Sequence, residues 1–369
     1  MKKELGFVIL VIIFLINSSL CLNENDDCTN PRQQSGKCIP VRNCQFIVSI
    51  LTSSTRTPEK TEFVKNSRCG VNNGRTLVCC PTLTDSNQVS SRLAKLPGID
   101  ECGAAGIQDR IVGGEITPLG EYPWMARLGY DRGLKGFAYS CGGSIINNKH
   151  IITAAHCITD IPNTWKLKHI RLGEWFTDTD PDCQDDVCAD NVVDIDVDKI
   201  ILHPNYNSDG KHQQNDIALI KVKHPIKYTD WVQPICLPTT QSLKTASTEN
   251  EVLYVAGWGA TETVYSSKYK LHLNITEVPL SQCANSYNRH FDLSLSDSQI
   301  CVGGERDRDS CKGDSGGPLM RLVNGPNLPY WYLVGIVSFG PQYCGTENIP
   351  GVYTKVSNYM NWIESNLTE

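Results

Sequence analysis

The chain has 369 residues, of which 40% are hydrophobic and 20% charged, the proportions of a globular protein long enough for two or more domains. A formal net charge of −6 gives no reason to expect nucleic acid or an anionic membrane as a partner. Seventeen cysteines indicate an oxidising compartment.

The N-terminus has the pattern of a secretory signal peptide. Basic Lys2-Lys3 precedes an apolar run at 6–16, and small or polar residues follow as far as Cys21. The apolar run is too short to span a bilayer comfortably. We therefore expect residues 1–21 to be removed and the protein to be secreted into the extracellular space. Without Cys21, sixteen of the seventeen cysteines remain, which allows eight disulfides.

Six cysteines lie within residues 28–80, a segment too short for a large hydrophobic core without covalent links. The last two are adjacent, Cys79-Cys80, and Pro81 follows them. Spacing alone allows 15 ways of pairing six cysteines. The polar sequence of residues 81–101, which contains Gly and Pro, indicates a linker.

From residue 111 onward, short β-rich runs alternate with Gly, Pro and Asn turns, which favours an all-β barrel or sandwich. These runs are 145–146, 151–152, 200–202, 217–222, 252–256 and 331–337. The single helical pattern is at the C-terminus, where apolar residues recur at helical spacing. They are Val356, Tyr359, Met360, Ile363 and Leu367.

Four motifs of this chain point to nucleophilic chemistry. In the first, residues 311–318, Ser315 stands between an acid and two glycines. A serine hydroxyl is a weak nucleophile until a base takes its proton, and glycine-rich backbone lets N–H groups stabilise the resulting oxyanion. The other motifs, 110–114, 153–157 and 215–219, supply a candidate cleavage site, His156 and Asp216.

Together the four motifs resemble the chymotrypsin/trypsin family of serine proteases, in its chain order of His, Asp and Ser. The resemblance implies an all-β fold of two six-stranded antiparallel barrels with a C-terminal helix and an active site between the barrels. Residues 28–80 resemble the clip domain of arthropod serine proteases, among them prophenoloxidase-activating and Spätzle-processing enzymes. The expected organisation is signal peptide 1–21, clip domain 28–80, linker and activation site 81–110, and protease domain 111–369.

The two resemblances imply a complete set of disulfides. In the clip domain the pairs are Cys28–Cys79, Cys38–Cys69 and Cys44–Cys80. In the protease part they are Cys102–Cys236, Cys141–Cys157, Cys183–Cys188, Cys283–Cys301 and Cys311–Cys344. The pair Cys283–Cys301 would brace a helix and a loop.

The protease resemblance also implies the role of each catalytic group. His156 takes the Ser315 proton and later donates it to the leaving amine, and Asp216 holds the imidazole in the right tautomer. The backbone N–H groups of Gly313 and Ser315 form the oxyanion hole.

Specificity is expected to come from Asp309, six residues before Ser315. By the resemblance it lies at the base of the primary pocket, where an acid selects Arg or Lys. Gly340 and Gly351 match the pocket walls, where a side chain would block a long basic residue.

The resemblance implies activation by cleavage after Arg110. The new ammonium of Ile111 would pair with Asp314 and lock the loop that carries the nucleophile. The disulfide Cys102–Cys236 would keep the severed N-terminal piece attached.

No cofactor is required for this chemistry. An acidic loop resembles the family's calcium site, with the carboxylates of Glu174 and Asp182 and the carbonyls of Phe176 and Thr179 as ligands. A solvated acidic loop is the alternative. Asn274 and Asn366 begin glycosylation sequons.

The sequence therefore predicts a secreted trypsin-like zymogen of an extracellular immune or developmental cascade. Its expected partners are a protein zymogen substrate, an upstream activating protease and a serpin-type inhibitor. A venom trypsin-like protease and a clip-domain binding cofactor with little activity are alternatives, the second disfavoured because His156, Asp216 and Ser315 are all intact. The clip domain is expected to bind protein through apolar and basic residues between its third and fourth cysteines: Phe46, Ile47, Val48, Ile50, Arg56 and Lys60.

Overall fold

The protein is described from a computed structural model. It describes residues 22–367 except 32–34, 45–46, 48–49, 51–57, 73–74, 82–95, 105–114, 208–212, 250, 262–263, 265, 307–309, 326–327 and 342. The expected signal peptide, most of the linker, Arg110, Ile111 and Asp309 lie outside the described residues.

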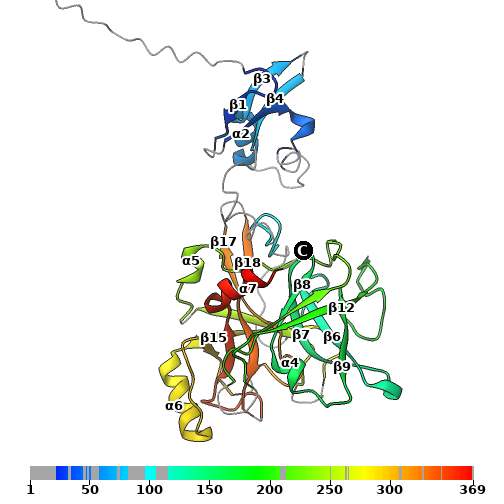
Figure 1. The fold of residues 1–369 in the computed structure, drawn as a ribbon, viewed down its shortest axis with the longest axis vertical. Helices are drawn as coiled ribbons and strands as arrows, with labels where there is room; N and C mark the ends of the chain where they lie inside the picture. The colour runs from blue at the N-terminus through cyan, green and yellow to red at the C-terminus, as the bar shows by residue number, and fades with distance from the viewer. Residues whose placement is uncertain are drawn as a thin grey trace, which may run out of the picture. The chain divides into compact units, whose positions relative to one another are not determined.

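The chain divides into two compact units, residues 1–88 and 89–369 (Figure 1). The first unit contains a four-stranded antiparallel sheet in the order β1-β2-β4-β3, with a 3-10 turn η1 and a helix α2. Their bounds are β1 Asp27–Thr29, β2 Ser35–Pro40, η1 Val41–Asn43, α2 Pro58–Asn66, β3 Arg68–Asn72 and β4 Arg75–Pro81. The sequence pattern does not predict α2, which has a weakly apolar sequence.

Three disulfides fasten this first unit, in the pairs that the clip resemblance implies: Cys28–Cys79, Cys38–Cys69 and Cys44–Cys80. Ile47 is fully buried against Cys44 and Val78, and Ile50 packs on the same small core. The expectation that Ile47 helps to bind protein is therefore wrong, because so short a domain needs apolar side chains inside, whereas the partly buried Ile50 stays a prediction. Phe46, Val48 and Arg56 lie outside the described residues.

The second unit contains two barrels (Figure 1). The first is a closed six-stranded antiparallel barrel in the order β12-β13-β8-β7-β6-β9. Its strands are β6 Met125–Asp131, β7 Phe137–Asn147, β8 His150–Thr153, β9 Lys166–Leu172, β12 Val193–Leu202 and β13 Ala218–Val222. A short hairpin, β10 Cys183–Gln184 with β11 Val187–Cys188, stands between β9 and β12 in the chain.

The second barrel has the order β14-β17-β18-β19-β16-β15, and β15 pairs back onto β14 to close it. Its strands are β14 Val252–Gly257, β15 Leu271–Val278, β16 Gln299–Val302, β17 Pro318–Asn324, β18 Pro329–Phe339 and β19 Gly351–Lys355. A two-residue strand, β5 (Glu115–Ile116), adds to the free edge of β15. The fold expected from the resemblance is thus confirmed.

Each β-rich run of the sequence overlaps a strand, and most of the apolar residues in these runs are buried in a barrel interior, although Leu202 and Val252 are exposed. The largest core contains Trp124, Tyr130 and the paired isoleucines of β7 and β8, all fully buried. It continues into the other barrel through Met320, which accepts a hydrogen bond from the Trp124 indole N–H at 3.1 Å. The largest core therefore spans both barrels, while further hydrophobic clusters lie in the second barrel.

The C-terminal helical pattern forms a 3-10 turn, η3 (Val356–Tyr359), that leads into α7 (Met360–Asn366). All five apolar residues of the pattern are buried. The sequence pattern misses α6 (Leu280–Phe291), in which only Cys283 and Tyr287 are buried. Leu280, Cys283 and Tyr287 nevertheless recur at helical spacing and pack on one hydrophobic cluster, and the disulfide Cys283–Cys301 also holds α6. Two helices are shorter, α4 (His156–Thr159) and α5 (Gln241–Lys244).

The second unit carries five disulfides, again in the pairs that the resemblance implies: Cys102–Cys236, Cys141–Cys157, Cys183–Cys188, Cys283–Cys301 and Cys311–Cys344. Eight disulfides in one chain indicate an extracellular protein. Among the described residues, no helix has the length and apolar character needed to cross a membrane.

Candidate active site

The pairing of β8 with β13 places His156 beside Asp216. Thr153 at the end of β8 lies opposite Ala218 at the start of β13, so the chain leaving β8 meets the chain entering β13. His156 Nδ1 lies 2.8 Å from Asp216 Oδ2, and the backbone N–H of His156 donates to Asp216 Oδ1 at 2.9 Å. These two hydrogen bonds thus fix the position of the imidazole relative to the carboxylate of Asp216.

Three hydroxyl groups that the sequence analysis does not predict hold the buried Asp216 and its neighbour Asn215. The Ser338 hydroxyl donates to Asp216 Oδ2, and the Thr354 hydroxyl donates to the Asp216 carbonyl at 2.8 Å. The Tyr359 hydroxyl donates at 3.1 Å to Oδ1 of Asn215, whose φ of 58° is left-handed. No sequence signal marks a lone hydroxyl residue in a buried strand, so only the structure reveals these contacts.

The pair has the electrostatics of a base and its orienting acid. Burial lowers the pKa of His156, but the Asp216 carboxylate outweighs burial, and the net pKa is raised above the ordinary value. Burial raises the pKa of Asp216, while His156 and the Ser338 hydroxyl hold the net pKa below its ordinary value. Asp216 therefore stays ionised and favours the imidazolium that forms when His156 takes a proton.

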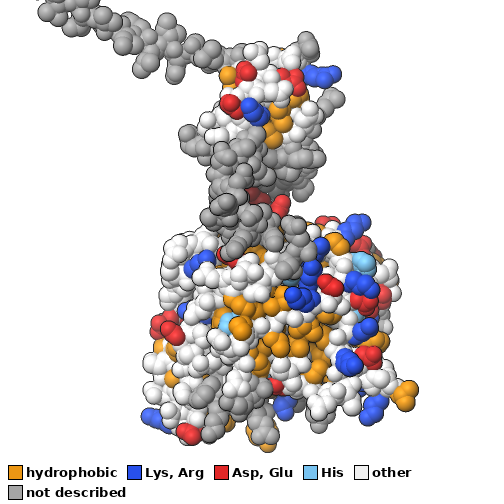
Figure 2. All heavy atoms as spheres, in the orientation of Figure 1, with side chains coloured by type: hydrophobic (Ala, Val, Ile, Leu, Met, Phe, Trp, Pro, Cys, Tyr) orange, Lys and Arg blue, Asp and Glu red, His pale blue; other side chains and the backbone are white. Residues whose placement is uncertain are grey.

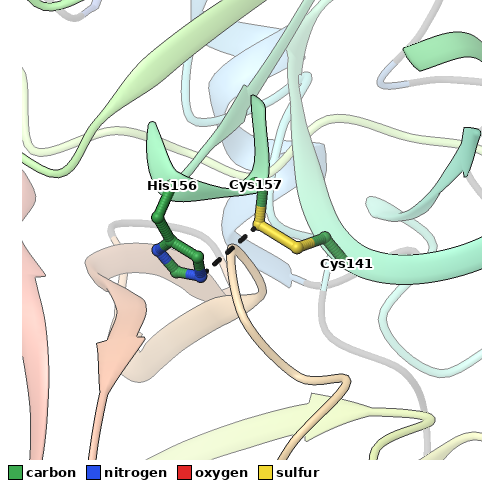
Figure 3. Close-up of side chains that lie close together, drawn as sticks. All are labelled: Cys141, His156 and Cys157. Atoms are coloured by element: carbon green, nitrogen blue, oxygen red, sulfur yellow. Dashed lines mark hydrogen bonds between the residues drawn. A yellow bond between two sulfur atoms is a disulfide. The ribbon is translucent and has the colours of Figure 1, made fainter. Parts of the chain in front are cut away.

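His156 also faces a disulfide, as Figure 3 shows. Its Nε2 lies 3.8 Å from Cys157 Sγ, and Cys157 is bonded to Cys141. These three residues are a possible metal cluster by distance, but the disulfide removes both thiolates that a metal would need. We therefore assign the group to bracing of the histidine turn.

Ser315 lies on the loop between β16 and β17. Its carbonyl accepts a hydrogen bond from Gly142 N–H of β7 at 2.8 Å, which ties the loop of one barrel to a strand of the other. Gly313 has φ of 103°, where a Cβ would also lie only 3.0 Å from Gly259 Cα, so the turn requires glycine. Within the described residues, the N–H groups of Gly313 and Ser315 donate to no backbone carbonyl, and no hydrogen bond joins Ser315 Oγ to His156.

Asp314 points away from Ser315 and into the protein. Its two carboxylate oxygens accept from Gly259 N–H at 2.8 Å and Cys311 N–H at 3.0 Å. A Cβ on Gly257 or on Gly259 would lie less than 2.5 Å from this carboxylate, so it packs directly on glycine backbone. Burial raises the pKa of Asp314 to about 6, against the lowering by the two N–H groups. No cation among the described residues pairs with it.

The residues expected to line the primary pocket are only partly described, since Asp309 is outside the described residues. Its neighbour Ser310 accepts a hydrogen bond from the Tyr353 hydroxyl at 2.8 Å, a contact that the sequence does not predict. Cys311–Cys344 links this segment to the loop that follows Gly340. Gly351 is buried as the first residue of β19.

Glu174 and Asp182, the expected calcium carboxylates, are both buried, at 3% and 2% exposure. Asp182 accepts from the N–H groups of Trp175 and Phe176 at 2.9 and 2.8 Å and from the Thr179 hydroxyl at 2.6 Å.

The surroundings of Glu174 decide whether this pair fits a cation. Its Oε2 lies 3.7 Å from Arg127 and 3.5 Å from Arg171, whereas the buried Oε1 has no hydrogen-bond donor among the described residues. Burial raises the pKa of Glu174, and Asp182 raises it further, against the lowering by the two guanidinium groups. The buried Lys270 also interacts with Glu174 and Asp182, so three cationic groups already face these carboxylates. The partnerless Oε1 leaves one oxygen open to a further cation, and the calcium site stays a prediction.

Of the two sequons, Asn274 is half-buried in β15 opposite Tyr254. Asn366 ends α7, where its Nδ2 donates to the Trp362 carbonyl at 2.8 Å. Both sites remain predictions.

Comparison with known proteins agrees with this architecture. The sequence matches the family model described as Trypsin over residues 111–363 and the one described as the regulatory CLIP domain of proteinases over residues 28–80. The chain belongs to the trypsin family of serine proteases and carries a clip domain.

Relatives share both parts of the chain. It is 44% identical to CLIP domain-containing serine protease B4 of Anopheles gambiae, over 94% of each chain. It is 36% identical to the Spaetzle-processing enzyme of Drosophila melanogaster, over 92% of this chain and 91% of the relative. A crystal structure of the drosophila Grass clip serine protease of the Toll pathway matches with a TM-score of 0.64 and 34% identity, covering 93% of this chain and 97% of that one.

Proposed function

We propose that this chain is the zymogen of a trypsin-like endopeptidase. The observation that carries the proposal is the hydrogen-bonded pair of His156 and Asp216, beside the loop of Ser315. His156 Nε2 takes the Ser315 proton as the hydroxyl attacks the scissile carbonyl, and later gives it to the leaving amine. Asp216 keeps Nδ1 protonated so that Nε2 can accept, and the N–H groups of Gly313 and Ser315 bind the oxyanion.

The enzyme cleaves after Arg or Lys in this proposal. Asp309 receives the basic side chain, and the exposed Gly340 and buried Gly351 leave room for its long stem. The support is local. The Tyr353–Ser310 hydrogen bond and the Cys311–Cys344 disulfide fasten the backbone on the C-terminal side of Asp309.

Activation follows cleavage after Arg110. The support is Asp314, a carboxylate that burial brings to a pKa of about 6 and that lacks a cation among the described residues. β5 is bound to β15, so the new terminus at Ile111 is tethered four residues away, about 13 Å of extended chain. Its ammonium would give Asp314 the missing charge. Cys102–Cys236 keeps the N-terminal piece attached.

The proposed setting is an extracellular cascade of innate immunity or development. The support is the relatives, which include a Spaetzle-processing enzyme and, at 38% identity over 99% of each chain, phenoloxidase-activating factor 1 of Holotrichia diomphalia. Its partners are then a protein zymogen as substrate, an upstream protease as activator and a serpin-type inhibitor. A non-catalytic binding cofactor is disfavoured because the base and its orienting acid are in hydrogen-bonded geometry.

A structural calcium ion completes the proposal, with Glu174 and Asp182 as carboxylate ligands and Phe176 and Thr179 as carbonyl ligands. Bound calcium would supply the positive charge that the partnerless Oε1 of Glu174 lacks. We expect calcium to raise the melting temperature of wild type by several degrees and of Glu174→Gln by much less. A melting temperature that changes with neither calcium nor chelator would favour the alternative, a loop without calcium that is held by its own hydrogen bonds and by the neighbouring arginines.

The test of the main proposal uses the full chain and its Arg110→Gln variant, each treated with a trypsin-like activator. Only the cut wild type should hydrolyse a small Arg peptide. Asp309→Ser in the cut enzyme should cost several kcal/mol of transition-state binding for this peptide, seen as a lower kcat/KM, because a buried charge pair is lost. The kcat/KM on a Phe peptide should change little. An uncut variant as active as the cut enzyme would refute the activation mechanism. A wild-type preference for Phe over Arg would refute the pocket.

A further inference from the structure

The short helix α4 carries an acidic residue, Asp160, one helical turn after His156. The helix begins at His156 and ends at Thr159, and the backbone N–H of Asp160 donates to the His156 carbonyl at 3.0 Å. Residues four apart on a helix lie on one face, with about 5–6 Å between their Cβ atoms. The exposed Asp160 therefore lies beside His156 on the solvent side, whereas the fully buried Asp216 approaches the imidazole from the interior.

Two hydroxyl groups hold the Asp160 carboxylate in place. The Thr159 hydroxyl donates to Oδ1 at 2.7 Å, and the Tyr206 hydroxyl donates to Oδ2 in a longer hydrogen bond of 3.4 Å. Tyr206 is half-buried on the connection between β12 and β13, the same connection that leads to Asp216. The carboxylate is thus fastened both to its own helix and to the chain segment that carries the other acid.

The stability of α4 does not account for an acid at this position. The C-terminal end of a helix favours cations and disfavours carboxylates. In the described part of the chain, no lysine or arginine forms an ion pair with Asp160. The negative charge of Asp160 is therefore not neutralised by a described neighbour, and it is available to act on His156.

The titratable groups around His156 all favour its charged form or stay neutral. Burial lowers the pKa of His156, whereas Asp216, and to a smaller extent Asp160, raise it. Burial raises the pKa of Tyr206, and both carboxylates raise it further, so this hydroxyl stays protonated and donates. Cys157, the remaining neighbour of the imidazole, is held in a disulfide and does not titrate.

We propose that Asp160 is a second acid for His156, a positioning residue that stabilises the imidazolium from the solvent side. The inference deepens the proposed function and rests on it, because it concerns the base of the same reaction. Asp216 fixes the tautomer through a direct hydrogen bond, whereas Asp160 acts through its charge alone. Two unit charges about 6 Å apart in water change an equilibrium about threefold, which sets the size of the expected effect.

The experiment follows kcat/KM of the full activated enzyme on a small Arg peptide between pH 5 and 8. The acid limb of kcat/KM reports the base of the free enzyme, which must be neutral to take the Ser315 proton. Without the charge of Asp160 the imidazolium is less stable, so this limb should move to lower pH. For Asp160→Asn, the rate at pH 5 relative to the variant's own rate at pH 8 should exceed the wild-type ratio about threefold. Asp160→Lys should raise the ratio about tenfold, and 1 M salt should remove most of both effects.

Further variants separate the charge of Asp160 from its support. Asp160→Glu keeps the charge and should keep the wild-type profile, while Tyr206→Phe removes one of the two supporting hydroxyls and should move the limb less than Asp160→Asn. Acidic and basic side chains are interspersed on the face of the second unit that Figure 2 shows, so the fields of distant charges largely cancel. The matched control Asp230→Asn, at an exposed carboxylate on the chain that follows β13, should therefore leave the limb in place.

Two results would overturn the proposal. One is an acid limb that stays in place in both Asp160→Asn and Asp160→Lys. The other is a rate that falls equally at every pH, which would show that Asp160 only supports the fold of α4. If the cut wild type hydrolyses no Arg peptide, the proposed function has failed, and NMR titration of the His156 imidazole judges the inference separately. The pKa of His156 should then be lower in Asp160→Asn than in wild type, and equal values would contradict the role of Asp160.

Discussion

His156 and Asp216 sit at the ends of adjacent strands of one closed barrel, whereas Ser315 lies on a loop between two strands of the other. The first pair is joined by two direct hydrogen bonds and backed by the Ser338 and Thr354 hydroxyls. The loop of Ser315 instead encloses Asp314, whose charge has no cationic partner among the described residues. The comparison teaches that folding alone joins the base to its acid, while the loop of Ser315 keeps a buried carboxylate that has no cation beside it among the described residues.

The largest expected effect comes from a change in the His156–Asp216 pair. Asp216→Asn keeps the shape but gives His156 Nδ1 a donor where it needs an acceptor, so the wrong tautomer forms. We expect kcat of the activated enzyme to fall about 10⁴-fold on a small Arg peptide, with KM little changed. An activity loss below tenfold in a variant with a native melting temperature would contradict the assignment of Asp216.

The second largest expected effect concerns Asp314, in the loop that carries Ser315. Asp314→Asn removes the carboxylate that would receive the Ile111 ammonium, so cleavage after Arg110 should no longer order the oxyanion N–H groups. We expect the cut variant to lose about 10³-fold in kcat, since removing one oxyanion donor alone costs 10²–10³. Active-site titration of the cut variant provides the measurement. Retention of wild-type kcat would contradict the role given to Asp314.

The uncut chain tests the same carboxylate through pH. Burial raises the pKa of Asp314 from 3.8 to about 6, so the folded state binds this proton more tightly than the unfolded state does. The stabilising contribution is full below pH 3.8 and is lost as pH rises through 6. Uncut wild type should therefore lose more melting temperature between pH 5 and 7 than uncut Asp314→Asn. Parallel curves for the two would show that this carboxylate does not titrate on unfolding.

The sequence predicts the contact between His156 and Asp216 poorly without the family resemblance, since 60 residues separate them and only the β8–β13 register brings them together. The strands could be predicted because short runs of β-branched residues between turns strongly favour β-strands over other structures. α6 could also have been predicted, since Leu280, Cys283, Ala284 and Tyr287 recur at helical spacing, a signal that the sequence analysis does not use. Ile47 was assigned to a surface because composition does not reveal which apolar side chains a small disulfide-rich unit keeps inside.

The hydroxyls around Asp216 mark the limit of what a motif can predict. Ser338, Thr354 and Tyr359 lie 122 or more residues from the groups they bond, and none belongs to a catalytic motif. Their role depends on which strand ends meet between the barrels, and that is a property of the closed fold. Any one of them could be found only after the barrels were in place.

The smallest expected effect comes from a change that weakens the support of the His156–Asp216 pair but leaves the pair itself intact. Tyr359→Phe keeps the buried ring, which also packs against His203, and removes only the hydroxyl that bonds Asn215 beside Asp216. We expect kcat to fall a few-fold with KM unchanged, because a neutral hydrogen bond contributes about 1 kcal/mol and acts here through a neighbour.

The pH profile of kcat separates a positioning role of Tyr359 from a general loss of stability. Asp216 raises the pKa of His156, so a looser Asp216 should lower that pKa and move the acid limb of kcat to lower pH. The matched control is Tyr332→Phe, a buried tyrosine of β18 whose change should leave the acid limb in place. An unchanged acid limb in Tyr359→Phe, whatever its kcat, would show that the C-terminal turn only packs against the catalytic acid and does not position it.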